Sequence, residues 1–293
     1  KKLKIKGVIT GCARSAIYTT SYLAKKFNTP ALNLKSAKLI SNKKKFLRKF
    51  NKKLFLKKSD LIKKKRIHFP VLTKDDKFSG AEGVTLIRNK YELLRKSSTN
   101  KDLIYEKYVK GSHLIVTGLV INSNIIFKKI IHKEINKDFT TKKLAYPNKL
   151  SKNIKKKINN FVTEKLKIIK FNHGPFTFEI FYNKNDIYCA EIEPSIPGSF
   201  INEQILKKCF NINLVDLIFK YHFKRNLYFQ NRSLGKINIE FFYRKLKFKE
   251  LILKKKYNGY KLKLKKINEP DKKNKKKCLY ILTSFKKNND KNL

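Results

Sequence analysis

Three glutamates within residues 174–198 have the residue type and spacing of a site for a hard divalent cation. Glu191 and Glu193 lie two residues apart in a run with strand periodicity, so both side chains project from the same face of one strand. Glu179 lies in the preceding apolar run, where a hairpin would let it face them. Three carboxylates on one face repel one another unless a cation or a proton lies between them, and a divalent ion shared with phosphates meets that need. The stretch is a candidate Mg-nucleotide site, and the alternative is a solvated sheet face.

The elements that position these acids follow from hydrophobic periodicity. Residues 177–182 and 186–193 predict two strands joined by a polar loop, and a Pro/Gly turn follows at 194–198, which places the acids at the mouth of a strand. Elsewhere the pattern predicts a strand at 4–10, a helix at 36–50, a polar loop at 138–150, a helix at 151–170, two helical pieces within 200–219, and strands at 237–243, 250–253 and 279–283. Strands and single helices in this order indicate an α+β protein.

Lys74 is a second candidate binding residue. It ends the compact apolar strand FPVLTK and precedes the loop DDKFSGAEG and a returning strand at 84–87. Backbone N–H groups of such a loop can cover phosphates, and the lysine supplies a point charge from the strand. The pattern therefore predicts a phosphate-covering flap, although an ordinary surface hairpin is the commoner origin of a loop of this composition.

The composition is that of a globular protein, since 41% of the 293 residues are hydrophobic. No run approaches about 18 apolar residues and no secretory signal is visible, so a cytoplasmic location is the default. The four cysteines lack metal-ligand spacing and a nearby paired histidine, which argues against zinc and against a disulfide framework.

The formal net charge of +51 by itself suggests a nucleic-acid partner. However, only eight of the 72 basic residues are arginine, whereas base recognition relies on the bidentate guanidinium. The lysines are spread along the whole chain together with Asn, Ile, Phe and Tyr, all of which have codons rich in A and T. Coding bias accounts for this surface, so we predict no specific nucleic-acid partner and no membrane partner.

Taken in order, four parts of the sequence resemble the motifs of the ATP-grasp superfamily of carboxylate-amine or carboxylate-thiol ligases. Ser41-Asn42-Lys43 followed by Phe46-Leu47-Arg48 is similar to the family's DK-x-x-x-R helix. FPVLTK with SGAEGV is similar to its phosphate lysine and glycine-rich flap, YEKYVKG to its adenine hinge, and GPFTFEI with AEIEPSIPG to its magnesium strands. The resemblance covers residues 1 to about 222.

The resemblance implies an α+β chain with the ATP-grasp fold, in which two antiparallel-sheet subdomains with helices close on Mg-ATP. The implied parts are a truncated N-terminal α/β unit with its connecting helix at 1–52, a small subdomain with the flap at 53–112, a large subdomain with the metal strands at 113–222, and a small β-rich C-terminal subdomain at 223–293.

Site residues are carried over position by position. The implied nucleotide-binding residues are Lys43 and Lys74 at the phosphates, Ser79, Gly80 and Gly83 in the flap, and Glu106, Lys107, Tyr108, Val109 and His113 at the hinge. Backbone groups of Lys107 and Val109 would bond the adenine edge. The implied metal-binding residues are Glu179, Glu191 and Glu193. The implied cofactors are ATP and Mg²⁺, with Mn²⁺ as a substitute. The chemistry needs no side-chain nucleophile, so no catalytic residue is assigned.

The implied activity is that of an ADP-forming ligase, which activates a carboxylate as an acyl phosphate and joins it to an amine. Its partners would be small carboxylate and amine molecules, and a homodimer is compatible with the sequence. The chain departs from the family pattern at Glu193, where the family has Asn, at Ser195, where it has Arg, and at His113, where it often has an acid. The missing arginine motivates the alternative, a degenerate Mg-ATP-binding protein without ligase activity.

Overall fold

The computed structural model describes residues 4–11, 14–57, 61, 68–75, 81–99, 103–184, 186–229, 231–244, 259–268 and 277–288. Ser79 and Gly80 of the predicted flap lie outside these ranges, as does the strand predicted at 250–253. Within the described ranges, no helix is long and apolar enough to cross a membrane.

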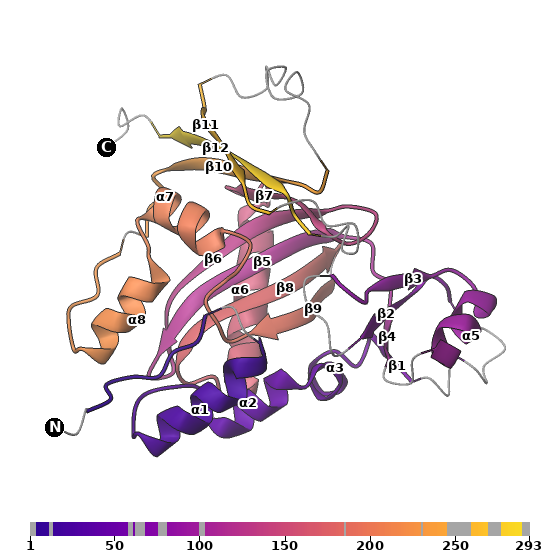
Figure 1. Cartoon of the computed structure of the whole chain (residues 1–293), viewed down its shortest axis with the longest axis horizontal. Helices are drawn as coiled ribbons and strands as arrows, with labels where there is room; N and C mark the ends of the chain where they lie inside the picture. The colour runs from indigo at the N-terminus through magenta and orange to yellow at the C-terminus, as the bar shows by residue number, and fades with distance from the viewer. Residues whose placement is uncertain are drawn as a thin grey trace.

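The strands form two sheets (Figure 1). Every strand pairing among the described residues is antiparallel, which confirms the predicted α+β class with two antiparallel sheets. The small sheet has the order β1-β4-β2-β3 and consists of β1 (Phe55–Leu56), β2 (Val71–Asp75), β3 (Thr85–Ile87) and β4 (Leu103–Lys107). The large sheet has the order β11-β12-β10-β7-β6-β5-β8-β9 and consists of β5 (Ser112–Ile121), β6 (Asn124–Ile135), β7 (Thr141–Tyr146), β8 (Gly174–Asn183), β9 (Asp186–Glu193), β10 (Gly235–Phe242), β11 (Lys261–Lys266) and β12 (Tyr280–Lys287).

Strand β5 is apolar along its length because helices cover both faces of the large sheet. From His113 onward all of its residues are buried. Successive side chains point to opposite faces, so Leu114 and Val116 join the core with helix α6 (Lys152–Ile168), whereas Ile115 and Leu119 join the core on the other face. Helix α6 begins after the predicted cap, where the Ser151 hydroxyl accepts a hydrogen bond from the backbone of Ile154.

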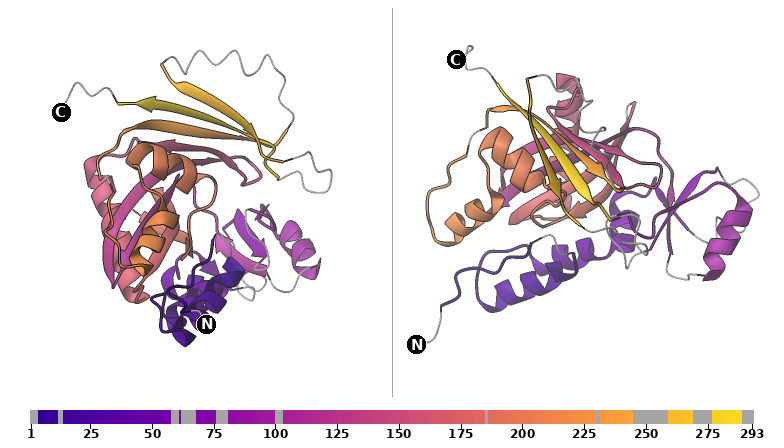
Figure 2. Two further views of the ribbon diagram at one scale, coloured as in Figure 1. Left: turned by 60° about the vertical axis from the view of Figure 1, so that its left-hand side comes forward. Right: turned by 45° about the horizontal axis from the view of Figure 1, so that its top comes forward.

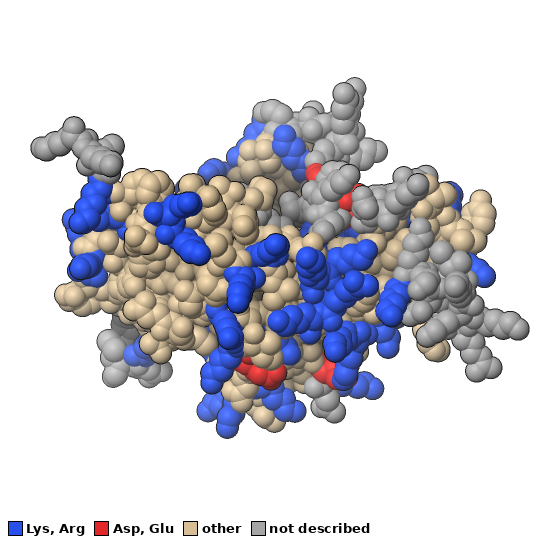
Figure 3. Space-filling model, turned by 90° about the horizontal axis from the view of Figure 1, so that it is seen from below, with Lys and Arg blue, Asp and Glu red and all other residues tan. Residues whose placement is uncertain are grey.

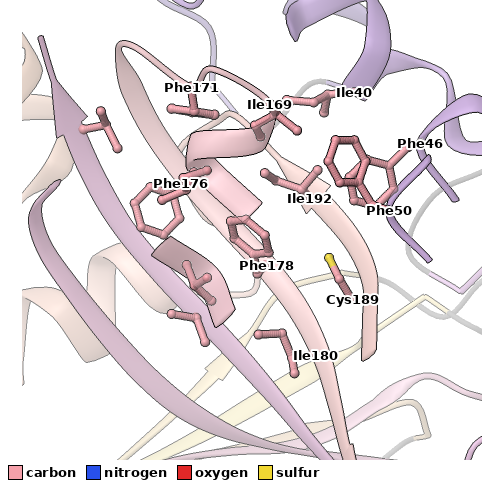
Figure 4. Packing of buried hydrophobic residues seen from close by; sticks show 14 of the residues in the cluster. Ile40, Phe46, Phe50, Ile169, Phe171, Phe176, Phe178, Ile180, Cys189 and Ile192 are labelled. Atoms are coloured by element: carbon pink, nitrogen blue, oxygen red, sulfur yellow. The ribbon is translucent and has the colours of Figure 1, made fainter. Parts of the chain in front are cut away.

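The core beneath the N-terminal helices is aromatic at its centre (Figure 4). Phe176 and Phe178 of β8 meet edge to face, with ring centroids 5.8 Å apart. Phe46 and Phe50 of helix α3 (Lys43–Phe50) stack at 5.1 Å, because residues four apart lie on the same side of a helix. The figure shows these two rings beside Ile192 of β9, so α3 packs directly on the edge of the large sheet.

The N-terminal part is helical, with a 3-10 turn η1 (Arg14–Ala16) followed by α1 (Ile17–Lys26), α2 (Leu34–Ser41) and α3. The prediction of one helix over 36–50 was wrong, because the chain breaks at Asn42. This residue has an extended backbone and caps α3 by accepting a hydrogen bond from the backbone of Lys45. The strand predicted at 4–10 was also wrong. In the described structure, residues 4–11 pair with neither sheet and Gly7 packs closely against the ring of His222 instead.

The other face of the large sheet is covered by a π-helical turn η2 (Ile201–Leu206) that continues into α7 (Lys207–Phe210), and by α8 (Leu214–His222). This confirms the two helical pieces predicted around residues 211–213. The Asn213 side chain caps α8 by accepting a hydrogen bond from the backbone of Val215.

The polar loop predicted at 138–150 was wrong because it contains β7, which pairs with β6 on one side and β10 on the other. Leu144 is its fully buried residue, and the flanking Lys142 and Lys143 mask the strand pattern in the sequence. Strands β10 and β12 lie where strands were expected, and they extend the large sheet to β11, a lysine-rich strand that was not predicted.

Helix α5 (Lys90–Thr99) covers the small sheet, where Leu93 packs with Val71, Ile87 and Tyr105. Figure 2 shows this small sheet and its helix at one side of the large sheet. Lys and Arg are spread over the face shown in Figure 3, among few acids, as the distribution of lysines along the chain implies.

Candidate nucleotide-binding site

A cavity of about 960 Å³ is lined by residues of both sheets and of α3. A volume of this order accommodates a nucleotide-sized ligand. Gly83 is not part of the lining, although its neighbours Glu82 and Val84 are, and its φ of +70° is a conformation that favours glycine. The predicted site residues that line the cavity are Lys43, Lys74, Glu106, Lys107, Tyr108, Val109, His113, Glu179, Glu191 and Glu193.

The chain passes from the small sheet to the large sheet through residues 108–111, at the wall of the cavity. The Lys107 N–H donates to the carbonyl of Leu54 at 2.8 Å, so its predicted contact with adenine would use the carbonyl oxygen. Val109 lies outside the strands, where backbone groups can serve a ligand. Gly111 packs tightly against strand β8 at the end of this segment. A Cβ at this position would lie 2.4 Å from the carbonyl oxygen of Tyr182 and clash with it. Residues 108–111 therefore form part of the cavity wall, and their contact with adenine stays a prediction.

Lys74 of β2 forms an ion pair with Glu106 of the neighbouring strand β4, with Nζ 2.9 Å from Oε2. Burial alone would lower the pKa of Lys74, but the charge and hydrogen bond of Glu106 outweigh it and raise that pKa. The other oxygen of Glu106, Oε1, is buried and has no hydrogen-bond partner in the described part of the chain. A charged lysine is therefore held at the cavity by an acid on the adjacent strand.

The predicted acid-bearing hairpin is formed by β8 and β9, and its register brings the acids together. Glu179 lies directly opposite Glu191, and Thr177 lies directly opposite Glu193. Alternate residues of β8 point to opposite faces, so Thr177, Glu179 and Phe181 line the cavity while the residues between them enter the core under α6.

Glu179 interacts with two basic side chains of the same sheet, one from the adjacent strand β5 and one from β6 beyond it. Its Oε1 is 2.6 Å from Nζ of Lys133 on β6, and its Oε2 is 3.2 Å from Nε2 of His113 on β5. Burial would raise the pKa of Glu179, but Lys133 and His113 outweigh it and hold that pKa well below its usual range. Burial against Phe181, whose ring centroid is 4.3 Å away, lowers the pKa of His113 despite the nearby acid. Glu179 is therefore ionised, and His113 is neutral at pH 7.

Lys43 begins α3 and reaches the cavity beside Glu191, with Nζ 4.0 Å from Oε1. Its side chain is only 13% exposed. The far end of α3 is tied to the same strand, because Asn51 Nδ2 donates to the carbonyl of Cys189 at 2.6 Å. The helix is thus fixed against β9 at both ends, which positions Lys43 beside the strand acids.

The three acids have the chemistry that suits Mg²⁺, since carboxylate oxygens are its usual protein ligands. Across the ranges that the structure describes, however, no group of three or more His, Cys, Asp or Glu side chains is arranged to hold a metal ion. Both oxygens of Glu179 contact basic side chains, Oε1 that of Lys133 and Oε2 that of His113. Glu179, Glu191 and Glu193 are the residues that would hold the ion, and metal binding by them stays a prediction.

The structure changes the predicted set of charged groups at the site at two residues. Ser195, at the position of the family's arginine, is 2% exposed and is not part of the cavity lining. Lys133, whose side chain is 11% exposed and contacts a strand acid, was missed. Strand β6 carries lysines at 128 and 129 as well, and only the pairing of Lys133 with His113 on β5 reveals which lysine reaches Glu179.

No protein-family model matches the sequence, and no curated protein matches it. Solved structures do match over most of the chain. An L-amino acid ligase from Bacillus licheniformis superposes with a TM-score of 0.74 at 17% identity, covering 95% of this chain and 75% of that one.

Two further solved structures are similar and contain nucleotide. The biotin carboxylase domain of the 2-oxoglutarate carboxylase from Hydrogenobacter thermophilus, in complex with MgADP, ADP and bicarbonate, has a TM-score of 0.66 at 15% identity, covering 92% of this chain and 67% of that one. An N5-carboxyaminoimidazole synthetase from Staphylococcus aureus, complexed with ADP, has a TM-score of 0.66 at 18% identity, covering 95% and 74%. At these identities the likeness establishes the fold.

Proposed function

From the ATP-grasp fold of this chain, we propose that it is an ATP-dependent, ADP-forming ligase that joins a carboxylate to an amine. The observation that supports this most is the single cavity in which the hinge, the lysines and the strand acids meet. These groups come from two sheets and a helix that are far apart in the sequence. Their convergence matches what phosphoryl transfer to a carboxylate requires.

The nucleotide would lie with its base at the hinge and its phosphates toward Lys74 and Lys43. Tyr108 and Val109 lie at the crossing between the sheets, and the two lysines lie on β2 and α3. Phosphates carry charge that must be neutralised in a partly dry cavity, and lysine provides it as a compact point charge. His113 stands where the family often has an acid for the ribose, and it is neutral and buried.

Mg²⁺ would be held by Glu191 and Glu193, with Glu179 opposite them, and it would neutralise the transferred phosphate. The donor set fits, because all three carboxylates face the same cavity as the lysines. The biotin carboxylase structure with MgADP gives the fold a precedent for this cofactor. The assignment of the three acids is ours.

The reaction would proceed in two steps. A substrate carboxylate oxygen forms a bond to the γ-phosphorus of ATP as the bond to the ADP oxygen breaks, which gives an acyl phosphate. The nitrogen of an amine then attacks the acyl carbon, the C–N bond forms, phosphate leaves and the amine loses a proton. Lys133, which lines the cavity beside Glu179, would neutralise the oxygens of the reacting carboxylate and phosphate. We also propose the division of the chain that the resemblance implies, with an N-terminal unit at 1–52, a small subdomain at 53–112, a large subdomain at 113–222 and a C-terminal subdomain at 223–293.

A specific observation favours a second candidate, a Mg-ATP-binding protein without ligase activity. The position of the family's arginine holds Ser195, which is buried away from the cavity lining. An enzyme without that cation depends on Lys133 for charge stabilisation during transfer. If Lys133 does not provide it, nucleotide binding remains and turnover is lost.

Steady-state release of ADP separates the two candidates. The protein is supplied with Mg-ATP and a panel of amino acids and other small acids, singly and in acid–amine pairs. The ligase predicts ADP release that requires an acid and an amine together, and that disappears in Lys133→Met. If the protein binds Mg-ATP but no acid–amine pair causes it to release ADP, the second candidate is correct.

A further inference from the structure

Three of the lysine–carboxylate ion pairs that line this cavity involve the predicted site residues. Lys43 lies 4.0 Å from Glu191, Lys74 lies 2.9 Å from Glu106, and Lys133 lies 2.6 Å from Glu179. All six side chains belong to the cavity lining. The lysines are the groups proposed to hold phosphate, and two of the acids are proposed to hold Mg²⁺. In this structure these groups neutralise one another.

Such pairing creates a competition at Glu179. One of its oxygens contacts Lys133 and the other contacts His113, so an incoming cation competes with both for the carboxylate. An anion that takes Lys133 must in turn leave Glu179 without its main counter-charge. The Lys133 side chain is 11% exposed and that of Glu179 is 32% exposed, so the pair is partly withdrawn from water, and removing one partner leaves the other charge uncompensated there. A cation alone takes Glu179 from Lys133 and gives the lysine no new anion, and an anion alone takes Lys133 from Glu179 and gives the carboxylate no new cation.

We propose that the pairs Lys133–Glu179 and Lys43–Glu191 are exchanged when the metal and the nucleotide bind together, so that each ligand binds weakly without the other. The carboxylates turn to the metal as the lysines turn to the phosphates, and every charge keeps a partner. This inference rests on the proposed function and adds a property to it, a strong coupling between two ligands.

Mg²⁺ titrated alone into the nucleotide-free protein tests one half of the exchange. In Lys133→Met the acid is released from its lysine, so calorimetry should show Mg²⁺ binding at least roughly tenfold tighter than in the unmodified protein. The matched control is Lys142→Met. Lys142 also lines the cavity and pairs with Glu134 at 3.7 Å, but its side chain is 62% exposed and its pair involves none of the three acids. The control should bind Mg²⁺ as the unmodified protein does.

A non-hydrolysable ATP analogue titrated in the presence of a chelator tests the other half. In Glu179→Gln, Lys133 is released from its acid, so metal-free affinity for the analogue should rise by roughly tenfold, and the gain in affinity on adding Mg²⁺ should shrink by a similar factor. This variant keeps the shape of the side chain, and it tests the exchange even if Lys133→Met does not fold.

Equal Mg²⁺ affinity in Lys133→Met, Lys142→Met and the unmodified protein would overturn the exchange, as would an unchanged metal-free affinity in Glu179→Gln. If the unmodified protein binds the analogue with Mg²⁺ while these differences are absent, the exchange fails and the proposed function stands. If the unmodified protein does not bind the analogue even with Mg²⁺, the proposed function fails. The titration with Mg²⁺ alone then still decides whether Lys133 competes for the acid.

Discussion

Replacing Lys74 with methionine should destabilise the fold through Glu106, before any effect on nucleotide binding is considered. Glu106 is 2% exposed, and among the described residues its Oε2 pairs with the Lys74 ammonium at 2.9 Å while its Oε1 has no hydrogen-bond partner. At an effective dielectric of about 20, charges at that distance attract by about 6 kcal/mol, of which desolvation cancels a large part. Without Lys74 the carboxylate stays buried and uncompensated, so we expect Lys74→Met to lose about 3–5 kcal/mol of unfolding free energy.

A double-mutant cycle checks this value. In Lys74→Met/Glu106→Leu both charges are replaced by apolar groups of similar volume, so the unfolding free energy should return to within about 1 kcal/mol of the unmodified protein. Equilibrium unfolding in urea measures all members of the cycle. As a control, Lys142→Met breaks the exposed pair with Glu134 and should cost less than about 1 kcal/mol. Losses that simply add in the double variant would refute the reasoning. The double variant also separates folding from function, because it should fold and yet bind the ATP analogue weakly.

Three further predictions concern the scaffold of the site. Burial lowers the pKa of His173 to about 4 from an ordinary value of 6.5, so its neutral form favours folding. The stability that depends on this form, up to about 3 kcal/mol, should be present above pH 6.5 and be lost as the pH falls toward 4. Urea unfolding at a series of pH values should show this loss, and His173→Phe should flatten it. Asn51→Ala removes the bond to the Cys189 carbonyl and should cost about 1–3 kcal/mol in the same assay. In Gly118→Ala the new Cβ would meet the carbonyl oxygen of Phe127 at 2.1 Å, so thermal unfolding should reveal a loss of at least about 1–3 kcal/mol.

The parts of the fold that could be predicted were those in which periodicity and position agree. Two apolar runs with strand periodicity on either side of a polar loop predicted the hairpin, and the structure pairs these strands with Glu179 opposite Glu191. The Ser151 cap and the apolar stripe after it predicted α6. In both cases short-range spacing determines the geometry, so the sequence alone carries the information.

The parts that failed depend on partners distant in the sequence. Strand β7 is recognisable only through its pairing with β6 and β10, because its lysines hide the single buried leucine, Leu144. The segment 4–11 is apolar enough for a strand, yet it joins neither sheet within the described residues. Lys133 gains its importance from β5 and β8, which place His113 and Glu179 beside it. No local pattern distinguishes it from the other lysines of β6.

Titration of the purified protein with a non-hydrolysable ATP analogue, with and without Mg²⁺, tests the central claim most directly. It is done at moderate salt, where the attraction of anions to exposed lysines is screened. We expect saturable binding at one site that strengthens when Mg²⁺ is present and weakens in Glu191→Gln. Weak binding that ignores Mg²⁺ and fades with added salt would contradict it, and would mean that the carboxylates and lysines of the cavity serve the fold alone.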